Sequence, residues 1–582
     1  MSKNQHGLAR GLTNYGDMDF SLYLRRANAA SMGYGKEILG KTVVGIGDTG
    51  SGFNNCHRHM PELIEAVKRG VLMAGGLPIV FPTISLGETF LSPTSMMYRN
   101  LMSMDTEEMI NAQPMDAAIL IGGCDKTLPA QLMGAANSKI PVISLITGPQ
   151  LTGHSEGERL GACTDCRRFW AKFRAAEIDK AGIEKIESRL VTTSGTCAVM
   201  GTASTMACIT ETLGMALPGT AAIPAIHADR LRAAEASGAQ AVHLAQIDRD
   251  KQLTPKKIIT PTSVENALRI LLAVGGSTNA IIHLTAIAGR LGIPIPLQQL
   301  NKLSDETPVL IDLKPTGDHY MEDLFKAGGL GVVLRELKPL LNLECLSVTG
   351  ETLNKRLQSE PAYVNREVVR SFDQPIQKMG GLVSLFGSLA PGGAILKRSA
   401  ADPTLFESEG KAVVFKSLED LANRIDDPDL EVEAHDILVL QNTGPMSDAA
   451  MPEAGYLPIP KKLAQSGVKD MIRISDARMS GTAYGTIVLH VTPEAAVGGP
   501  LALVKDGDKI KISVRNRSID LLVDKAELEN RRQKLVSNVT TKHNRGYKKL
   551  YYETVLQADG GCDFDFLRDP SLLNNETKTG DV

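Results

Sequence analysis

Three consecutive residues, Cys124, Asp125 and Lys126, have side chains that could take part in chemistry. They lie within the stretch IGGCDKTLP at residues 121–129. A thiol is a soft metal ligand, a carboxylate is a hard one, and a lysine amine is a base whose pKa responds to burial. Ordinary packing does not require this combination. The alternative interpretation, a loop cysteine beside a surface aspartate and lysine, fits this stretch alone equally well.

These residues follow a short apolar run at residues 117–120, which predicts a buried strand. Two glycines directly after the run are expected to let the backbone turn sharply. The thiol, the carboxylate and the amine would then emerge at the carboxyl end of a strand. Open α/β sheets place their chemistry at that edge.

Strands and helices are predicted to alternate through the first part of the chain. Apolar runs at residues 42–46, 77–83 and 141–147 predict further strands, and Pro61 opens an amphipathic helix after the first of them. This alternation predicts an α/β N-terminal domain with parallel sheets flanked by helices, over residues 1–375.

Other loops of this part carry possible ligands. Cys56 lies in a Gly-rich loop after the first run, Glu88 lies in a loop after the second, and Cys197 lies in the stretch TTSGTCAVMG. Glu88 is a hard oxygen ligand that would pair with Asp125 on Mg²⁺. The ordinary alternative for an isolated loop glutamate is a solvated side chain.

The character of the chain changes near residues 371–378. Short β-like runs follow, such as GAILK, KAVVF, DILVL and TIVLHV, and turn residues separate them. They predict a second, C-terminal β-barrel-like domain over residues 376–582. Two loops in this domain, at residues 441–456 and 475–485, combine glycines with reactive side chains.

Composition excludes several classes of protein. The chain has 582 residues, 43% of them hydrophobic, and a net charge of −3, which predicts a globular protein of at least two domains. It has no basic run or aromatic–basic alternation, which argues against a nucleic-acid partner. No apolar run approaches the roughly 20 residues of a membrane-spanning helix, and the first residues lack a hydrophobic signal core. We therefore expect a cytoplasmic protein with no membrane partner.

Cysteine usage points to chemistry more than to structure. Eight cysteines are too few for a disulfide framework in this length, so those that matter are expected to be ligands or nucleophiles. Cys163 and Cys166 form the only CxxC motif. A thioredoxin-like redox pair is one interpretation, but no thioredoxin-like pattern surrounds it, and the following residues predict an amphipathic helix. We expect two free thiols, for which no role follows.

Five segments of the chain resemble the signature segments of the dihydroxy-acid and sugar-acid dehydratase family. They are GGCDKTLPA, TTSGTCAVMGTASTM, GGSTNAIIHL, NTGPMSDAAMPE and SDARMSGT. The segments occur in family order, and the resemblance covers essentially the whole chain. The SLGE loop, the version SDARMSGTAYGT and the ending RGYKKLYYETVLQADGGCDFDFL are similar to the sugar-acid branch, which acts on aldonates such as L-arabinonate and D-xylonate. The alternative within the family is dihydroxy-acid dehydratase of branched-chain amino-acid biosynthesis.

The resemblance implies two cofactors. The implied iron–sulfur ligands are Cys56, Cys124 and Cys197. Three cysteines suit a [2Fe-2S] or a [4Fe-4S] cluster, and the sugar-acid branch favours [2Fe-2S]; three thiolates also leave an iron position open for substrate. The implied Mg²⁺ ligands are Glu88, Asp125, Lys126 and Glu453. Lys126 can serve as a ligand only when its amine is converted to a carbamate.

The resemblance also implies a reaction and an assembly. Ser480 would be the base that removes the C2 proton of a 2,3-dihydroxy acid, the C3 hydroxyl would leave, and the enol would tautomerise to a 2-keto-3-deoxy acid. This role requires a strongly depressed serine pKa. Thr482 would either orient the substrate or line the turn. A homodimer or homotetramer is implied, with the barrel closing over the α/β domain.

A function of a different class is an iron–sulfur redox carrier or sensor that uses Cys163 and Cys166. Such a protein is expected to need four cysteine ligands. The sequence shows no fourth cysteine in a loop that matches the other three. It therefore favours a hydro-lyase.

Overall fold

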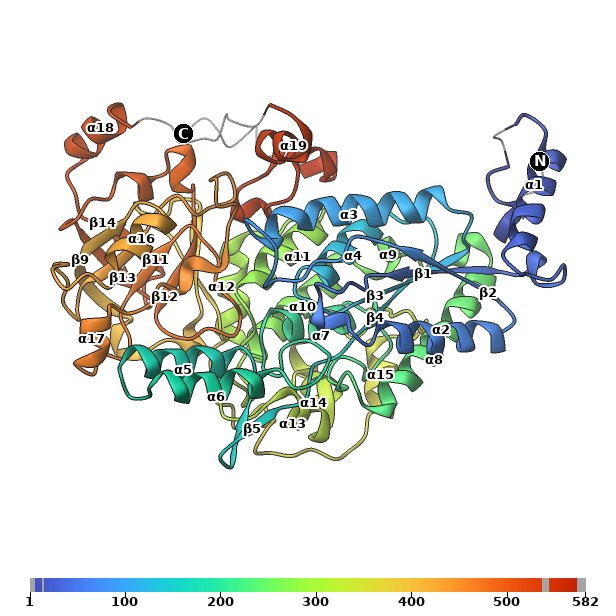
Figure 1. Ribbon diagram of the computed structural model, residues 1–582, viewed down its shortest axis with the longest axis horizontal. Coiled ribbons are helices and arrows are strands. Elements are labelled where there is room, and N and C mark those ends of the chain that lie inside the picture. Colours follow the sequence, from blue (N-terminus) through green and yellow to red (C-terminus); the bar gives the residue numbers. More distant parts are fainter. Residues whose placement is uncertain (1–5, 13–14, 536–543, 573–582) are drawn as a thin grey trace.

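The computed structural model describes residues 6–12, 15–535 and 544–572. In this structure the chain forms two sheet-based parts that lie beside each other (Figure 1). The N-terminal part is an α/β domain with a parallel sheet flanked by helices, and the C-terminal part is a barrel-like sheet. Both elements of the predicted fold class are confirmed.

The N-terminal part is organised around a four-stranded parallel sheet with the order β2-β1-β3-β4. Its strands are β1 (Val43–Asp48), β2 (Leu77–Pro82), β3 (Ala117–Gly122) and β4 (Val142–Ile146). β3 and β4 are buried along their whole length, as expected where helices cover both faces of a parallel sheet. The predicted runs agree with these strands to within two residues at each end.

Helices cover the two faces of this sheet in pairs. α2 (Met60–Met73) packs against α8 (Ala228–Gln246) on one face, and α3 (Ser95–Ala112) packs against α4 (Thr127–Ala135) on the other (Figure 1). α2 and α8 approach closely because Gly70 has no side chain: a Cβ there would lie 1.9 Å from the Glu235 carbonyl oxygen.

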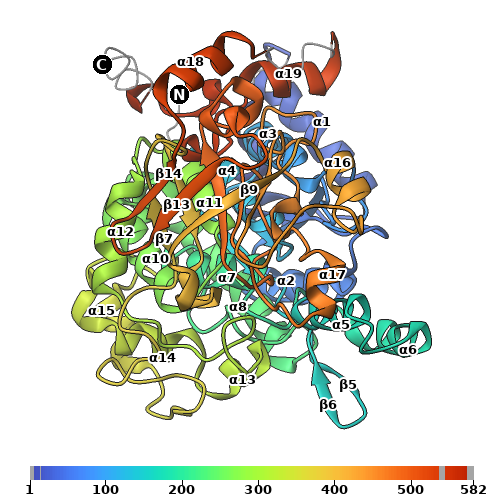
Figure 2. The same cartoon turned by 90° about the vertical axis from the view of Figure 1, so that its left-hand side faces the viewer.

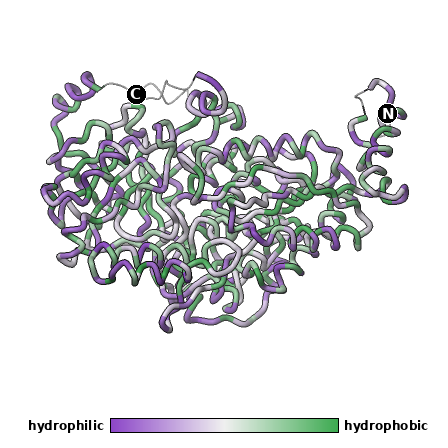
Figure 3. The backbone as a smooth tube through the Cα atoms, viewed as in Figure 1, coloured by the Kyte–Doolittle hydropathy of each residue, from purple (hydrophilic) through white to green (hydrophobic). Residues whose placement is uncertain are grey.

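Further helices extend the core away from the sheet. They are α1 (Met18–Ser31), α5 (Thr164–Arg174), α6 (Lys180–Leu190), α7 (Thr202–Thr212), α9 (Pro255–Ile258), α10 (Pro261–Ala273), α11 (Asn279–Gly289), α12 (Leu297–Glu306), α13 (Met321–Lys326), α14 (Gly329–Glu336) and α15 (Leu353–Ser359). Every residue of α7 and α11 is buried. A short hairpin of β5 (Gly153–Ser155) and β6 (Glu158–Leu160) projects from this part (Figure 2). Figure 3 shows hydrophobic residues concentrated in the sheet and hydrophilic ones at the rim.

The C-terminal part is an eight-stranded sheet with the order β14-β13-β9-β10-β11-β12-β8-β7. The strands are β7 (Val383–Leu385), β8 (Gly393–Leu396), β9 (Glu407–Phe415), β10 (Ile437–Leu440), β11 (Arg473–Ser475), β12 (Ile487–Thr492), β13 (Lys509–Ser513) and β14 (Ser518–Leu521). Helices α16 (Leu418–Arg424), α17 (Lys461–Gln465) and α18 (Lys525–Gln533) flank it. Phe386, just after β7, pairs with Ser518 of β14, so the two edges of the sheet meet and the barrel nearly closes.

The last described segment returns from the barrel to the N-terminal part. It contains α19 (Gly546–Thr554), whose Tyr551 and Tyr552 share a hydrophobic cluster with Met97 of α3 and Ile282 of α11. Figure 1 shows α19 beside the end of α3.

The domain boundary that we expect between residues 375 and 376 stays a prediction. Among the described residues, no helix combines the length and apolarity needed to cross a membrane.

A buried ion pair fastens this returning segment. The Arg290 guanidinium donates to both carboxylate oxygens of Asp563, at 2.9 and 3.0 Å, and the side chains are 1% and 0% exposed. Both charges are withdrawn from water and need compensation. Asp563 is the nearer partner of Arg290, and the Glu107 carboxylate lies farther away, at 3.5 Å.

Replacement of this aspartate should destabilise the whole protein. Asp563→Asn leaves the buried Arg290 charge poorly compensated, which costs about 3–5 kcal/mol by analogy with other broken buried pairs. We expect a clear fall in the midpoint of thermal unfolding. Glu184→Gln removes one side of an exposed i,i+4 pair with Lys180 and should leave the midpoint nearly unchanged. Equal midpoints for the two variants would contradict the assigned importance of the buried pair.

Candidate functional site

The loops that follow β1, β2 and β3 all open at the carboxyl edge of the parallel sheet. Cys56 lies in a 3-10 turn after β1, Glu88 lies between β2 and α3, and Cys124 lies between β3 and α4. Asp125 and Lys126 follow Cys124 directly before α4 begins. The structure therefore brings these side chains to the edge of the sheet where we expected them.

The glycines before Cys124 allow close packing, a role that the sequence did not predict. Neither Gly122 nor Gly123 has a positive φ angle, and the turn itself lies at Asp125 and Lys126, where the Thr127 amide donates to the Cys124 carbonyl at 2.9 Å. What the structure requires is space: a Cβ on Gly123 would lie 1.7 Å from the Thr147 hydroxyl oxygen. The absence of a side chain lets the Cys124 loop pack directly against the end of β4.

Cys197 reaches the same edge through backbone pairing with the segment after β4. The Thr196 amide donates to the Gly148 carbonyl at 3.0 Å, and the Gln150 amide donates to the Thr196 carbonyl at 2.8 Å. Cys197 follows this pairing and precedes α7. The loop thus continues the order of the sheet by one extended segment.

The barrel supplies the opposite wall of the site. Glu453 lies in the loop after β10, and Ser480 and Thr482 lie in the loop between β11 and β12. A cavity of about 430 Å³ separates the two parts. The predicted site residues that line it are Cys56, Glu88, Cys124, Asp125, Cys197, Glu453, Ser480 and Thr482. Lys126 is completely buried beneath it. This placement leaves the individual roles of these residues as predictions.

Three carboxylates converge on one side of the cavity. Oxygen atoms of Glu88, Asp125 and Glu453 lie within 4.8 Å of one another. Two buried cations contact them: the Lys126 amine lies 2.5 Å from Asp125, and the Arg478 guanidinium donates to Glu88 at 2.6 Å and to Glu453 at 2.7 Å. The group is a set of hard oxygen donors in which positive charge already lies close by.

The same charges shift the carboxylate pKa values in opposite directions. Burial raises the pKa of Glu453 to about 7, and the neighbouring Glu88 charge adds to this effect. Burial also raises the pKa of Asp125. Burial acts in the same direction on Glu88, but the positive charges of Arg478 and Lys126 outweigh it and hold the pKa of Glu88 below its ordinary value.

Four thiols line the same cavity, one more than the three predicted ligands. They belong to Cys56, Cys124, Cys163 and Cys197. The Cys163 sulfur lies 3.7 Å from the Cys197 sulfur. The sequence offered no fourth cysteine in a matching loop, and the folded chain nevertheless brings Cys163 to the same cavity. Cys163 and Cys166 are free thiols, as predicted.

The thiols interact in pairs. A hydrogen bond with Cys56, together with burial, raises the pKa of Cys124, and a hydrogen bond with Cys163 raises that of Cys197. Cys163 accepts from Cys166 and Cys197, which lowers its own pKa. Cys163 and Cys197 are 34 positions apart in sequence, so only the folded chain shows this proximity.

His57 holds the Cys124 loop in place. Its Nε2 atom accepts hydrogen bonds from the amides of Gly123 and Cys124, both at 3.1 Å. Its Nδ1 atom lies 3.0 Å from the Thr49 carbonyl oxygen, to which it donates. Burial lowers the pKa of His57 to about 4, so the imidazole is neutral and can accept at Nε2.

Sequence reasoning missed His57, Cys163 and Arg478 as parts of the site. His57 had a usable signal, since it directly follows Cys56. Arg478 had another, because it lies inside the segment SDARMSGT. Cys163 had none beyond its CxxC spacing.

The Ser480 hydroxyl faces the cavity beside Thr482. Their oxygen atoms lie 2.8 Å apart, and the Thr482 amide donates to the Ser480 oxygen at 3.4 Å. Thr482 is 2% exposed. A serine of the barrel thus lines the same cavity as the thiols and the carboxylates.

Models of a single family match both parts of the chain. The model described as dihydroxy-acid/6-phosphogluconate dehydratase N-terminal matches residues 41–356, and its C-terminal counterpart matches residues 367–562. Both parts of the chain are thus those of a dehydratase, an enzyme that eliminates water. The chain belongs to the dihydroxy-acid/6-phosphogluconate dehydratase family, as the resemblance of its motifs indicated.

Curated relatives fall on both sides of the predicted branch point. L-arabonate dehydratase of Azospirillum brasilense is 44% identical over 91% of this chain and 92% of its own length. 6-deoxy-6-sulfo-D-gluconate dehydratase of Pseudomonas putida is 44% identical over 92% of both chains. Dihydroxy-acid dehydratase of Caldanaerobacter subterraneus is 35% identical over 92% of this chain and 96% of its own. Of these three, the two named for sugar acids are the more similar.

The three converging carboxylates predict a binding test that does not depend on turnover. Glu453→Gln removes one charged oxygen donor, so the Kd for Mg²⁺, measured by isothermal titration calorimetry, should weaken roughly tenfold or more. Glu529→Gln, a matched change at an exposed position of α18, should leave the Kd unchanged. The same Mg²⁺ affinity in both variants would exclude Glu453 as a ligand.

Proposed function

We propose that this protein dehydrates an aldonic acid, a 2,3-dihydroxy sugar acid such as L-arabinonate or D-xylonate, to the 2-keto-3-deoxy acid. The observation that carries the proposal is the shared cavity, in which a serine of the barrel faces thiols and carboxylates of the α/β part. The greater identity to relatives named for sugar acids supports the substrate class.

The donor atoms fit the two cofactors that the family implies. Soft thiols and hard carboxylates both line the cavity, and these are the ligand types that suit an iron–sulfur cluster and a Mg²⁺ ion respectively. Cys56, Cys124 and Cys197 would hold the cluster, as [2Fe-2S] or alternatively [4Fe-4S]. Glu88, Asp125, Glu453 and Lys126 would hold Mg²⁺. Lys126 would do so as a carbamate, because an ammonium at this position would repel the cation.

The protein's own groups have distinct tasks in this proposal. When bound, the cluster supplies a Lewis acid for the departing C3 hydroxyl, and Mg²⁺ supplies positive charge for the substrate carboxylate and the C2 oxygen. Ser480 removes the C2 proton from the opposite wall. Enclosure between the two parts keeps bulk water away from the reacting carbons, which strengthens these electrostatic effects.

Polar side chains in the wall of the cavity favour a hydroxylated substrate over a branched aliphatic one. Gln150, Thr196 and Thr202 contribute to its wall. The side-chain oxygen of Gln150 is buried and has no hydrogen-bond partner among the described residues. A polyol chain can satisfy such a group, whereas 2,3-dihydroxyisovalerate ends in methyl groups that cannot. Dihydroxy-acid dehydratase activity is therefore the second candidate.

A substrate panel tests the proposed reaction. The anaerobically purified, Mg²⁺-supplied protein should form 2-keto acids from pentonates or hexonates and little from 2,3-dihydroxyisovalerate. Ser480→Ala should keep its iron and lose turnover by several orders of magnitude, because the base is absent. The reverse substrate preference would move the protein to the branched-chain reaction, and full activity of Ser480→Ala would remove the proposed base.

The extra thiol allows a direct test of the cluster ligands. Cys197→Ser should lose cluster iron and the visible absorption of the protein, whereas Cys163→Ser, at the other member of the same thiol pair, should retain both. Iron and sulfide analysis of the two variants measures this difference. Equal loss in both variants would indicate four cysteine ligands, which is what the redox or sensor alternative requires.

The expected homodimer or homotetramer and the cytoplasmic location stay predictions.

A further inference from the structure

The proposed function leaves one chemical difficulty, which is the weak basicity of a serine hydroxyl. To remove a carbon-bound proton, Ser480 must first become an alkoxide, and its surroundings must favour the negative charge. Thr482 is the residue that contacts the Ser480 oxygen, through both its hydroxyl and its amide. What Thr482 itself contacts therefore determines how well it can support that charge.

Thr482 receives a hydrogen bond from a charged side chain of the other part of the protein. Nη1 of Arg167, on α5, donates to the Thr482 hydroxyl oxygen at 2.8 Å. A guanidinium can only donate, while a threonine hydroxyl has a single hydrogen and two lone pairs. Thr482 is thus the acceptor toward Arg167, and its own hydrogen is free to point at the Ser480 oxygen 2.8 Å away.

Among the described residues, Arg167 is not paired with a carboxylate. Its neighbours on α5 are paired, Arg168 with Asp165 and Arg174 with Asp426. Arg167 forms no ion pair with a carboxylate within the part of the chain that the structure describes. Its guanidinium instead donates to the Cys163 carbonyl and lies 5.6 Å from the centroid of the Tyr456 ring. It also interacts with the Cys163 thiol and contributes to the lowered pKa of that group.

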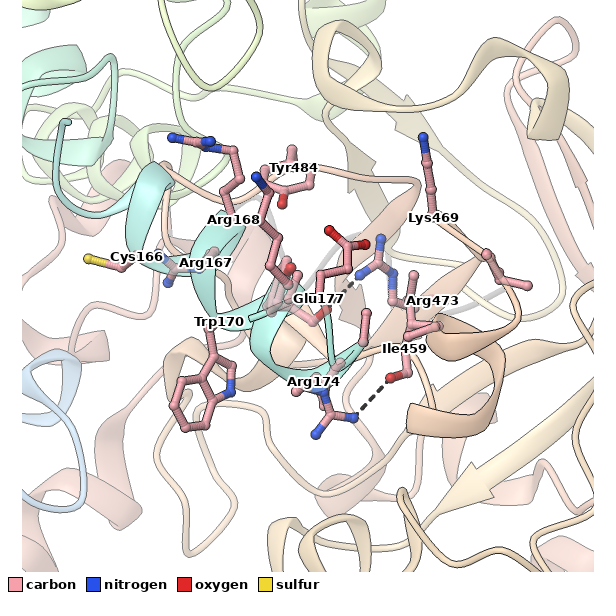
Figure 4. A pocket seen from close by; sticks show the side chains of 18 of the residues that line it. Cys166, Arg167, Arg168, Trp170, Arg174, Glu177, Ile459, Lys469, Arg473 and Tyr484 are labelled. Carbon is pink, nitrogen blue, oxygen red and sulfur yellow. Dashed lines mark hydrogen bonds between the residues drawn. The ribbon is translucent and has the colours of Figure 1, made fainter. Parts of the chain in front are cut away.

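Arg167 lies between two cavities. It lines the site cavity and also a larger one of about 790 Å³ between α5 and the barrel. Figure 4 shows Arg167 and Arg174 in the wall of this larger cavity, with Arg174 bonded to Ile459 of the barrel. The chain from Arg167 through Thr482 to Ser480 is therefore formed only when the barrel is seated against α5 (Figure 2).

We propose that Arg167 is a positioning residue that acts through Thr482 to stabilise the alkoxide of Ser480. The proposal rests on the proposed function, in which Ser480 is the base. Hydrogen bonds with an ionised donor are stronger than neutral ones, and a chain of them polarises each member toward the negative end. The Thr482 hydroxyl then connects Arg167 to Ser480. This role differs from the two expected from the sequence, which were to orient the substrate or to line the turn.

The alternative explanation is that Arg167 merely helps to dock α5 against the barrel. Arg174 provides the matched control, because it joins the same helix to the barrel through Asp426 and Ile459 and does not contact Thr482. Loss of docking alone should affect both arginine variants alike.

The first experiment measures the turnover of L-arabinonate by variants of Arg167 and Arg174. Arg167→Met should lower kcat roughly 10- to 100-fold, the effect of losing one charge-assisted hydrogen bond, with iron content and KM little changed. Arg167→Lys should recover part of the loss, because a single donor contacts Thr482. Arg174→Met should retain kcat. Unchanged kcat in Arg167→Met, or equal losses in both Met variants, would overturn the proposal.

A double-mutant cycle tests whether Arg167 acts through Thr482. In a Thr482→Val background, Arg167→Met should cause almost no further loss of kcat, whereas independent effects would multiply and overturn the proposal. L-arabinonate deuterated at C2 should show an isotope effect in Arg167→Met at least as large as in the native enzyme. A smaller effect would mean that the variant slows a step other than proton removal, against the proposal.

Ser480→Ala separates failure of this inference from failure of the proposed function. An inactive Ser480→Ala protein beside an unaffected Arg167→Met protein would overturn the relay and keep the base. An active Ser480→Ala protein would overturn the base and the relay together.

Discussion

A single buried guanidinium joins the two parts of the molecule at the site. Arg478 comes from the barrel, is fully buried, and donates to Glu88 of the α/β part and to Glu453 of the barrel. Ions withdrawn from water cost several kcal/mol each unless they are paired and hydrogen-bonded. Any displacement of the barrel would leave these charges uncompensated, so the electrostatics favour one docking position for the two parts.

That docking position brings together groups that no single part contains. The thiols belong to loops of the α/β part, the serine belongs to a barrel loop, and the carboxylates come from both. Soft and hard donors line this one cavity, where the Cys124 sulfur lies 3.9 Å from a carboxylate oxygen of Asp125. The site is in this sense an interface, and its chemistry depends on assembly of the whole chain.

Much of the fold and a large share of the site were predictable because their signals are local. The strand ending before Cys124 is apolar and short, and the loops after it combine glycine with ligands within a few residues. The lining of one cavity by Cys56, Glu88 and Glu453 agrees with motifs that resemble a known family. Long-range partners were not predictable in this way, because spacing along the chain contains no information on distances across it. Cys163, which the sequence left without a role, lies against Cys197.

By itself, the sequence determined the class of fold, the order of the strands along the chain and the family. It also determined which residue types are available for chemistry. These features are predictable because periodicity and motifs can be recognised in consecutive residues. Only the tertiary structure decided which charges meet and which hydroxyl faces which cation. The pairing of Arg478 with Glu88, and the chain from Arg167 through Thr482 to Ser480, join residues hundreds of positions apart. Such contacts follow from packing two hydrophobic cores against each other while keeping every buried charge paired or hydrogen-bonded.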